Sequence, residues 1–349
     1  MVGTIRRRTL AAGALAVAAG RSLPARAQQA TLRIHHFLPP QAPVPFGFIE
    51  PWAKRVMEQS NGRLKVEIYP AMQLGGRAPA LFDQAKDGVV DIIWTLTGYT
   101  PDRFPKSEVF DLPFLAGNAE QTSQAAWEFY EKHLRDEFKD VKVLAVHVHG
   151  AGVLHVRGNG VRKLEDMRGL KLRAPTRVIS QLLEALGAAP VPMPVPQVPE
   201  ALQRGVIDGT VIPWEVTRSL RVPELVQSHT SFTGSRALYT TLFVFAMNKP
   251  RYDGLAPELR KIIDDNSGPG AAHELGRVMD AGDLPAIEVA KARNNALITL
   301  DAAETARWRE AAQPVIDAWI AETGKRGFDG KALVDDARAL IAKYAGPAG

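Results

Sequence analysis

The sequence contains no cysteine, and this absence excludes several kinds of chemistry. Without a thiol, the chain can form no disulfide, no thiolate nucleophile and no cysteine-ligated metal site. It also lacks a Gly-rich loop ending in Gly-Lys-Ser/Thr, a strand-associated GxGxxG turn and a serine nucleophile elbow. Phosphate-cradling and acyl-transfer chemistry are therefore unsupported, and we expect a protein that is not an enzyme and that requires no cofactor.

An excess of charge of one sign is absent once residues 1–27 are set aside. The full sequence has 43 basic and 38 acidic residues, but five of the arginines and none of the acids fall within residues 1–27. The remainder is close to neutral. A nucleic acid or an anionic membrane would require a net basic face, so we expect no nucleic-acid partner.

Long hydrophobic runs are also absent, since none approaches the roughly 18 apolar residues of a membrane span. We expect no direct membrane insertion. The short apolar run Leu10–Gly20 lies between Arg6–Arg8 and the small residues of Ala25–Ala27, a pattern typical of a secretory signal peptide. Residues 1–27 are thus predicted to be removed during export to the periplasm, and the consecutive arginines leave both the general and the twin-arginine routes open.

Short apolar runs rich in β-branched residues alternate with longer amphipathic stretches, which predicts an α/β fold with largely parallel sheets. Strands are expected at Leu32–Phe37, Leu64–Tyr69, Asp91–Thr95, Val143–Val148, Leu154–Arg157, Leu170–Arg173, Gly209–Ile212, Leu238–Met247 and Ala296–Leu300. Helices are expected at Phe48–Ser60 and Arg77–Lys86, and the chain after Pro257 is mostly helical with interruptions at Pro269 and Pro285. One late helix should begin at Asp301, which forms a capping box with Glu304.

Helices that return late in the chain to cover earlier sheets predict two discontinuous lobes. We expect residues 28-150 with 237-280 to form lobe I, and residues 151-236 with 281-349 to form lobe II. Several crossings between two lobes create a hinge about which they can close on a ligand.

Arg173 is the residue from which we infer a ligand. It is the last cation of a short strand that Pro175 ends, and ligands of such sheets bind beyond the carboxyl ends of the strands. A guanidinium group matches a carboxylate with two parallel hydrogen bonds. By itself the position is weak, because most arginines are solvated or salt-bridged at the surface.

The histidines admit a different interpretation. His36 ends the first strand, where a ligand contact is reasonable, and His147 and His149 lie two apart on one strand face. No third residue at metal-ligand spacing follows them, so a structural or pocket-lining role is favoured. An exported enzyme of unfamiliar type, built on His147, His149 and Glu215, is the alternative.

Several ordered motifs resemble one family, the extracytoplasmic solute receptors of tripartite ATP-independent periplasmic (TRAP) transporters. The resemblance extends from about Thr31 to Lys325 and rests on Asn61–Leu64, Pro70, Gln73–Gly76, Val109–Phe114, Leu164–Pro175, Gly187–Met193 and Ala201–Gly209. It implies a two-lobed periplasmic binding protein fold with crossing strands and a long C-terminal hinge helix. It further implies that the protein captures a small organic carboxylate and delivers it to the membrane permease subunits, with Arg173 pairing with the carboxylate.

Other positions follow from the resemblance or from the strand-end rule. The expected ligand-binding residues are Arg173, Trp214, Gln73, His36, Thr95, Thr97, Ile212, Glu215, Val153 and Phe243. Glu215 is also a candidate cation ligand, because some relatives bind 2-oxo acids through a metal ion. Spacing does not decide this point, and we commit to no metal.

Departures from the family narrow the expected ligand. Gln197 and Pro199 stand where many relatives have an acid and a tyrosine, Ile212 stands where sialic-acid receptors have an asparagine, and Val153 stands near their second arginine. Hydroxyl-rich ligands need many polar partners. The sequence therefore favours a 2-oxo acid, or a monocarboxylate with an aromatic or apolar body. A receptor that presents its ligand to a sensor kinase remains an alternative.

Overall fold

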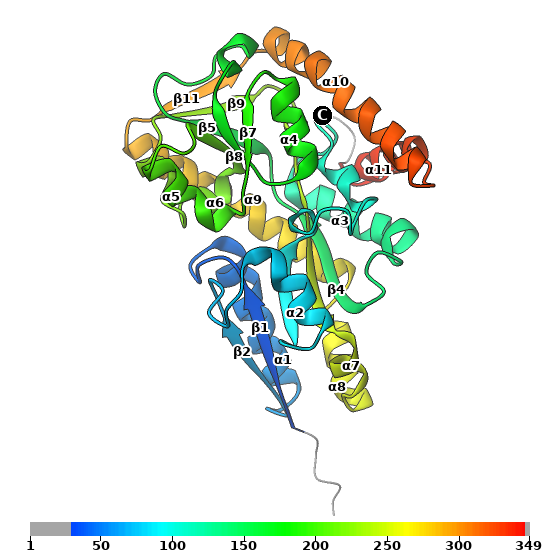
Figure 1. Ribbon diagram of the computed structural model, residues 1–349. Helices are drawn as coiled ribbons and strands as arrows, with labels where there is room; N and C mark the ends of the chain where they lie inside the picture. Colours follow the sequence, from blue (N-terminus) through cyan, green and yellow to red (C-terminus); the bar gives the residue numbers. More distant parts are fainter. Residues whose placement is uncertain (1–28, 346–349) are drawn as a thin grey trace, which may run out of the picture.

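The computed structural model describes residues 29–345, so the expected signal peptide lies outside the described residues. The chain forms two α/β lobes, one above the other in Figure 1, each built on its own mixed sheet. Five of the nine strand pairings are parallel, in agreement with the predicted fold class.

The first sheet has five strands in the order β2-β1-β3-β10-β4. Its strands are β1 (Ala30–His36), β2 (Leu64–Tyr69), β3 (Ile92–Leu96), β4 (Val141–Val148) and β10 (Leu242–Asn248). β1 pairs in parallel with β2 and β3, whereas β10 runs antiparallel to β3 and β4. The carboxyl ends of β1 and β2 point toward the second lobe (Figure 1).

The second sheet has six strands in the order β11-β9-β5-β8-β6-β7. Its strands are β5 (Gly152–Val156), β6 (Lys171–Ala174), β7 (Ala189–Pro192), β8 (Gly209–Pro213), β9 (Ser228–Phe232) and β11 (Ala296–Leu300). β6 pairs in parallel with β7 and β8, and β5 runs antiparallel to β8 and β9. The antiparallel strands are β10 in the first sheet and β5 in the second. Each is the strand that the chain enters when it crosses from the other lobe.

Helices cover both sheets and join the lobes. They are α1 (Glu50–Gln59), α2 (Leu81–Lys86), α3 (Ala119–Phe129), α4 (Arg177–Ala185), α5 (Val198–Gln203), α6 (Trp214–Thr217), α7 (Lys249–Asp253), α8 (Pro257–Asp265), α9 (Pro269–Ala292), α10 (Ala302–Lys325) and α11 (Gly330–Ala345). The long helix α9 packs against α3 and β4 of the first lobe and against α6 of the second. It is thus a hinge element, and α11 closes the chain by packing on α3.

Most of the predicted elements agree with the structure, with some shifted ends. The side chain of Asp301 accepts a hydrogen bond from the backbone N–H of Glu304 at 2.8 Å and so caps α10, as predicted. Pro285, predicted to interrupt a helix, lies inside α9. β10 begins at Leu242 rather than Leu238, and the polar β9 and proline-containing β7 were not predicted.

Within residues 29–345, no helix combines the length and the apolar character that crossing a membrane would require.

Candidate functional site

A small cavity lies where strand ends from the two sheets meet. Its walls are mainly aromatic and aliphatic, with a few polar side chains among them. The lining residues are Phe37, Leu38, Trp94, Leu96, Tyr99, His149, Arg173, Pro175, Val195, Ile212, Pro213, Glu215, Val216, Tyr239, Phe243 and Met279. An apolar cavity with few convergent polar groups is the usual form of a small-molecule site.

Arg173 is a buried cation, with only 2% of its surface exposed. β6 places it, and its Nε donates to the carbonyl oxygen of Met193 at 2.9 Å while Nη1 donates to that of Val211 at 3.3 Å. These bonds fix the plane of the guanidinium. No Asp or Glu of the described chain forms an ion pair with it, although a buried charge is costly unless it is paired. The site is therefore prepared for an anion.

Tyr99 helps to shape the Arg173 end of the cavity. It ends the 3-10 turn η3 (Thr97–Tyr99) that follows β3, and its hydroxyl accepts a hydrogen bond from the backbone N–H of Val195 at 2.9 Å. Burial raises the pKa of the Tyr99 phenol, and the positive charge of Arg173 opposes that rise. The Tyr99 phenol is therefore close enough to Arg173 for the charge of the guanidinium to affect its pKa.

Stacked rings form one wall of the cavity. Trp94 stacks on Phe37 and on Phe243, with ring centroids 5.1 Å and 5.0 Å apart and interplanar angles of 6° and 9°. Behind this wall, His147 stacks on Phe243 at 4.9 Å. Flat rings of this kind present a surface that suits another planar ring.

His149 and Tyr239 close another side. Nδ1 of His149 donates to the carbonyl oxygen of Gly150 at 2.6 Å, and burial lowers the pKa of His149 to about 4, so the imidazole is neutral. The two rings meet edge to face at 5.3 Å. A Cβ at Gly152 would lie 2.1 Å from the ring of Tyr239, so this crossing point requires glycine.

Glu215 is the acid in the cavity wall. It lies in the first turn of α6, is 5% exposed, and its backbone N–H donates to Oδ1 of Asp283 at 3.1 Å. Burial raises the pKa of its carboxyl well above the ordinary range, and the neighbouring Asp283 raises it further. Both effects favour the protonated form of the Glu215 carboxyl group.

The structure brings together four of the ten candidate residues identified from the sequence. Arg173, Ile212, Glu215 and Phe243 line the cavity. The other six lie outside its lining: Trp214, Gln73, His36, Thr95, Thr97 and Val153.

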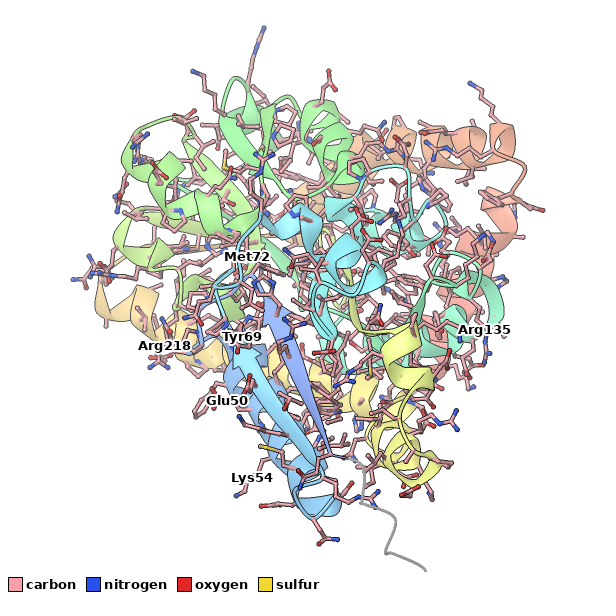
Figure 2. The ribbon with its side chains drawn as sticks, turned by 60° about the horizontal axis from the view of Figure 1, so that its bottom comes forward. Glu50, Lys54, Tyr69, Met72, Arg135 and Arg218 are labelled. Atoms are coloured by element: carbon pink, nitrogen blue, oxygen red, sulfur yellow. The ribbon has the colours of Figure 1, made fainter. Side chains whose placement is uncertain are left out.

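These six side chains have other surroundings. Trp214 and Val153 pack with Ala286 and Ala290 of α9 in a separate apolar cluster. Gln73 is exposed in the turn after β2, next to Met72, which Figure 2 labels at the end of that strand. Thr97 donates its hydroxyl to the carbonyl oxygen of Leu242 at 3.1 Å.

His36 and Thr95 are buried near the cavity without lining it. His36 meets Trp94 edge to face at 6.4 Å. Thr95 lies between Trp94 and Leu96 on β3, so the alternation of the strand directs it to the opposite face. The cavity residues that the sequence argument did not select include Tyr99 and Tyr239, which lie in irregular segments beside strand ends.

The described residues contain neither a cluster of metal-ligating side chains nor a histidine arranged for catalysis. Among residues 29–345, no group of three or more His, Cys, Asp or Glu side chains is placed to hold a metal ion. Nε2 of His147 accepts a hydrogen bond from Nε1 of Trp94 at 2.8 Å, and burial lowers the pKa of His147 to about 3. Such a histidine has neither a free nitrogen pointing at a substrate nor the pKa of a general base.

Comparisons with known proteins agree with this geometry. The sequence model of the family described as bacterial extracellular solute-binding protein, family 7, matches residues 34–323. A TRAP solute-binding protein from Rhodoferax ferrireducens, solved with copurified benzoate, is 48% identical with a TM-score of 0.89, covering 91% of this chain and 99% of that one.

Two further structures are similar. A marine metagenome TRAP solute-binding protein specific for aromatic acids, solved with 3-hydroxybenzoate, is 45% identical with a TM-score of 0.89 and coverage of 91% and 99%. One from Bordetella bronchiseptica with bound (R)- and (S)-mandelate is 29% identical with a TM-score of 0.83 and coverage of 90% and 99%.

Proposed function

This chain belongs to bacterial extracellular solute-binding protein family 7, and on that basis we propose that its cavity holds an aromatic monocarboxylate by an ion pair with Arg173. It is a solute-binding receptor of the TRAP type, which captures a small organic carboxylate between its two lobes. The more specific ligand class, a single aromatic ring with one carboxylate, is the substance of the proposal.

One observation carries this assignment: Arg173 is buried, has no acidic partner in the described chain and faces a cavity walled by stacked rings. A carboxylate would neutralise the guanidinium through a bidentate pair. An aromatic ring would fill the apolar space against Trp94 and Phe243. A sugar acid, in contrast, would leave several hydroxyl groups without partners on these walls.

The relatives support the same class. Benzoate, 3-hydroxybenzoate and mandelate each combine one aromatic ring with one carboxylate, and they occupy structures that are 29% to 48% identical to this chain.

The mechanism needs no chemical step. The open receptor admits the anion, Arg173 pairs with its carboxylate, and closure of the lobes about α9 removes water and strengthens the ion pair. We propose that the closed form is the one recognised by the membrane permease subunits. Export to the periplasm, with the twin-arginine route as one of two possibilities, completes the proposal.

A thermal-shift screen tests the proposed ligand class. We expect benzoate to raise the melting temperature of the purified protein in proportion to the logarithm of its concentration above the dissociation constant. Benzamide is the matched control, because it keeps the ring and removes the charge. A screen in which neutral sugars or benzamide stabilise the protein and no carboxylate does would refute the proposal.

A further inference from the structure

Glu215 is the polar group of the cavity that an ion pair between Arg173 and a carboxylate leaves without a role. The turn from β8 into α6 places it in the wall, and its backbone N–H is held by Asp283 of α9. A Cβ at Gly282 would lie 2.5 Å from the Cβ of Glu215, so α9 approaches the base of this side chain closely. The backbone of Glu215 is therefore anchored to α9.

The carboxyl group of Glu215 is incompletely satisfied. Its Oε2 is buried and has no hydrogen-bond partner among residues 29–345. Leaving such an oxygen unpaired costs free energy, and Glu215 is one of the residues that line the cavity, so a ligand group is a partner that would satisfy it. The same part of the chain supplies no Lys, Arg or His in an ion pair with Glu215, and the acidic side chains nearest in electrostatic effect are Asp283 and Asp280.

An uncharged carboxyl group can both donate and accept a hydrogen bond. Burial raises the pKa of Glu215 well above its usual range, which favours this protonated form. A hydroxyl group has the same dual character, whereas a second carboxylate would be disfavoured beside the acids Asp283 and Asp280. The chemistry of the group thus matches a hydroxyl in preference to an anion.

Arg173 and Glu215 come from different elements, β6 and α6, and the remaining walls are largely apolar. Tyr239 lines the same cavity, and its pKa is raised chiefly by burial, with the charge of Arg173 opposing that rise. The cavity therefore has a cationic group and a carboxyl group set in walls that are otherwise largely apolar.

We propose that Glu215 hydrogen-bonds to a hydroxyl group on the ligand ring, so that the receptor selects hydroxylated aromatic monocarboxylates over their unsubstituted parents. This inference rests on the proposed function, since it requires the carboxylate of the same ligand to be on Arg173. It assigns discrimination to Glu215 and capture of the anion to Arg173.

Calorimetric titration of the purified protein with benzoate and with 2-, 3- and 4-hydroxybenzoate tests the proposal. We expect 3- or 4-hydroxybenzoate to bind about tenfold more tightly than benzoate, because the hydroxyl satisfies a buried partner that benzoate leaves unpaired. The 2-hydroxy isomer serves as a control, since its hydroxyl lies beside the carboxylate at the Arg173 end and should gain nothing from Glu215.

Two substitutions separate the role of Glu215 from general packing. Glu215→Gln retains a donor and an acceptor and should retain the preference, whereas in Glu215→Leu the ratio of hydroxybenzoate to benzoate affinity should fall to about onefold. Thermal melting of the two unliganded variants shows that they are folded.

Three outcomes would overturn the inference: no preference for either hydroxy isomer in the wild type, a preference that persists in Glu215→Leu, or benzoate binding that requires added Na⁺ or Ca²⁺. The last would show that a cation, rather than a ligand hydroxyl group, is needed at the site. If benzoate and all its hydroxy derivatives fail to bind the wild type, the proposed function itself fails, which is a different result.

Discussion

Trp94 donates its indole N–H to Nε2 of His147 at 2.8 Å, and this bond fixes the imidazole behind the aromatic wall of the cavity. The other ring nitrogen, Nδ1, bonds the carbonyl oxygen of Val148 at 3.2 Å and therefore carries the proton. Both residues are fully buried. The histidine thus acts as a neutral acceptor that orients Trp94, and the planar wall depends on its remaining neutral.

This relationship predicts a pH dependence of stability. Burial lowers the pKa of folded His147 to about 3, whereas the unfolded chain takes up the proton near the ordinary value of 6.5. The unfolded state therefore binds more protons between these values, so the stability that neutral His147 provides is complete above pH 6.5 and is lost as the pH falls. Between pH 7.5 and 5 this loss amounts to about 2 kcal/mol.

The variant His147→Gln isolates the effect, because its amide can still accept the bond from Trp94 but does not titrate. Urea denaturation at both pH values should show the wild type losing about 2 kcal/mol more than the variant. Glu137 and Asp283, whose pKa values burial raises to about 7, respond in the opposite direction in both proteins and cancel in the comparison. Equal losses in the two proteins would show that His147 is not held neutral.

Substitution of Phe243 tests whether the wall formed by Phe37, Trp94 and Phe243 binds the aromatic ring of the ligand. Its centroid lies 5.0 Å from that of Trp94, so Phe243→Leu removes one stacked ring and leaves an apolar side chain. We expect calorimetry to show benzoate binding about three- to tenfold more weakly, the range of an aromatic pair. Cyclohexanecarboxylate, which has no π system, should change by less than about twofold. An equal loss for both ligands would mean that Phe243 supplies volume alone.

A charged network that joins α4 to α10 should contribute to stability. Arg177, at the start of α4, donates through Nη2 to Oε2 of Glu108 and through Nη1 to Oε2 of Glu322, each at 2.6 Å. It thereby joins the 3-10 turn η4 (Ser107–Asp111) to α4 and α10, and the side chain of Glu108 is only 14% exposed.

We expect Arg177→Ala to lower the free energy of unfolding by about 1–3 kcal/mol, because it leaves the mostly buried Glu108 without its cation and the network is partly screened by solvent. Arg204→Ala is the matched control, since it breaks an exposed pair with Glu200 on α5 and should cost less than about 0.5 kcal/mol. Denaturant titration of both variants gives the comparison, and equal effects would show that the network contributes no more than a surface pair.

The sequence predicted the α/β fold because alternation and strand ends are local patterns. The polar β9 and the proline-containing β7 were not recognised, because their pairing partners β5, β11 and β6 are distant in sequence and only these partners make them strands. For the same reason, Tyr239 was placed within a strand rather than in the irregular segment that brings it to the cavity.

The sequence predicted part of the candidate site. The chosen residues that do not line the cavity differ from those that do in the direction of their side chains. Arg173 was found from its place at the end of a strand together with the family resemblance, and Ile212 from the resemblance. On β3, Thr95 was chosen as a strand-end position that matches the family, although the alternation that brings Trp94 and Leu96 into the cavity turns Thr95 away. Trp214 and Glu215 are adjacent, and only the direction in which α6 begins places Glu215 in the cavity and Trp214 against α9.

Titration of benzoate into the wild type and into Arg173→Lys and Arg173→Ala tests the central claim most directly. Melting of the unliganded variants checks that loss of the bonds to Met193 and Val211 has not unfolded them. We predict that Arg173→Ala raises the dissociation constant by about two to four decades, because a buried carboxylate loses its partner, and that the lysine variant recovers only part of this loss. Binding of benzoate by Arg173→Ala within about threefold of the wild type would contradict the account.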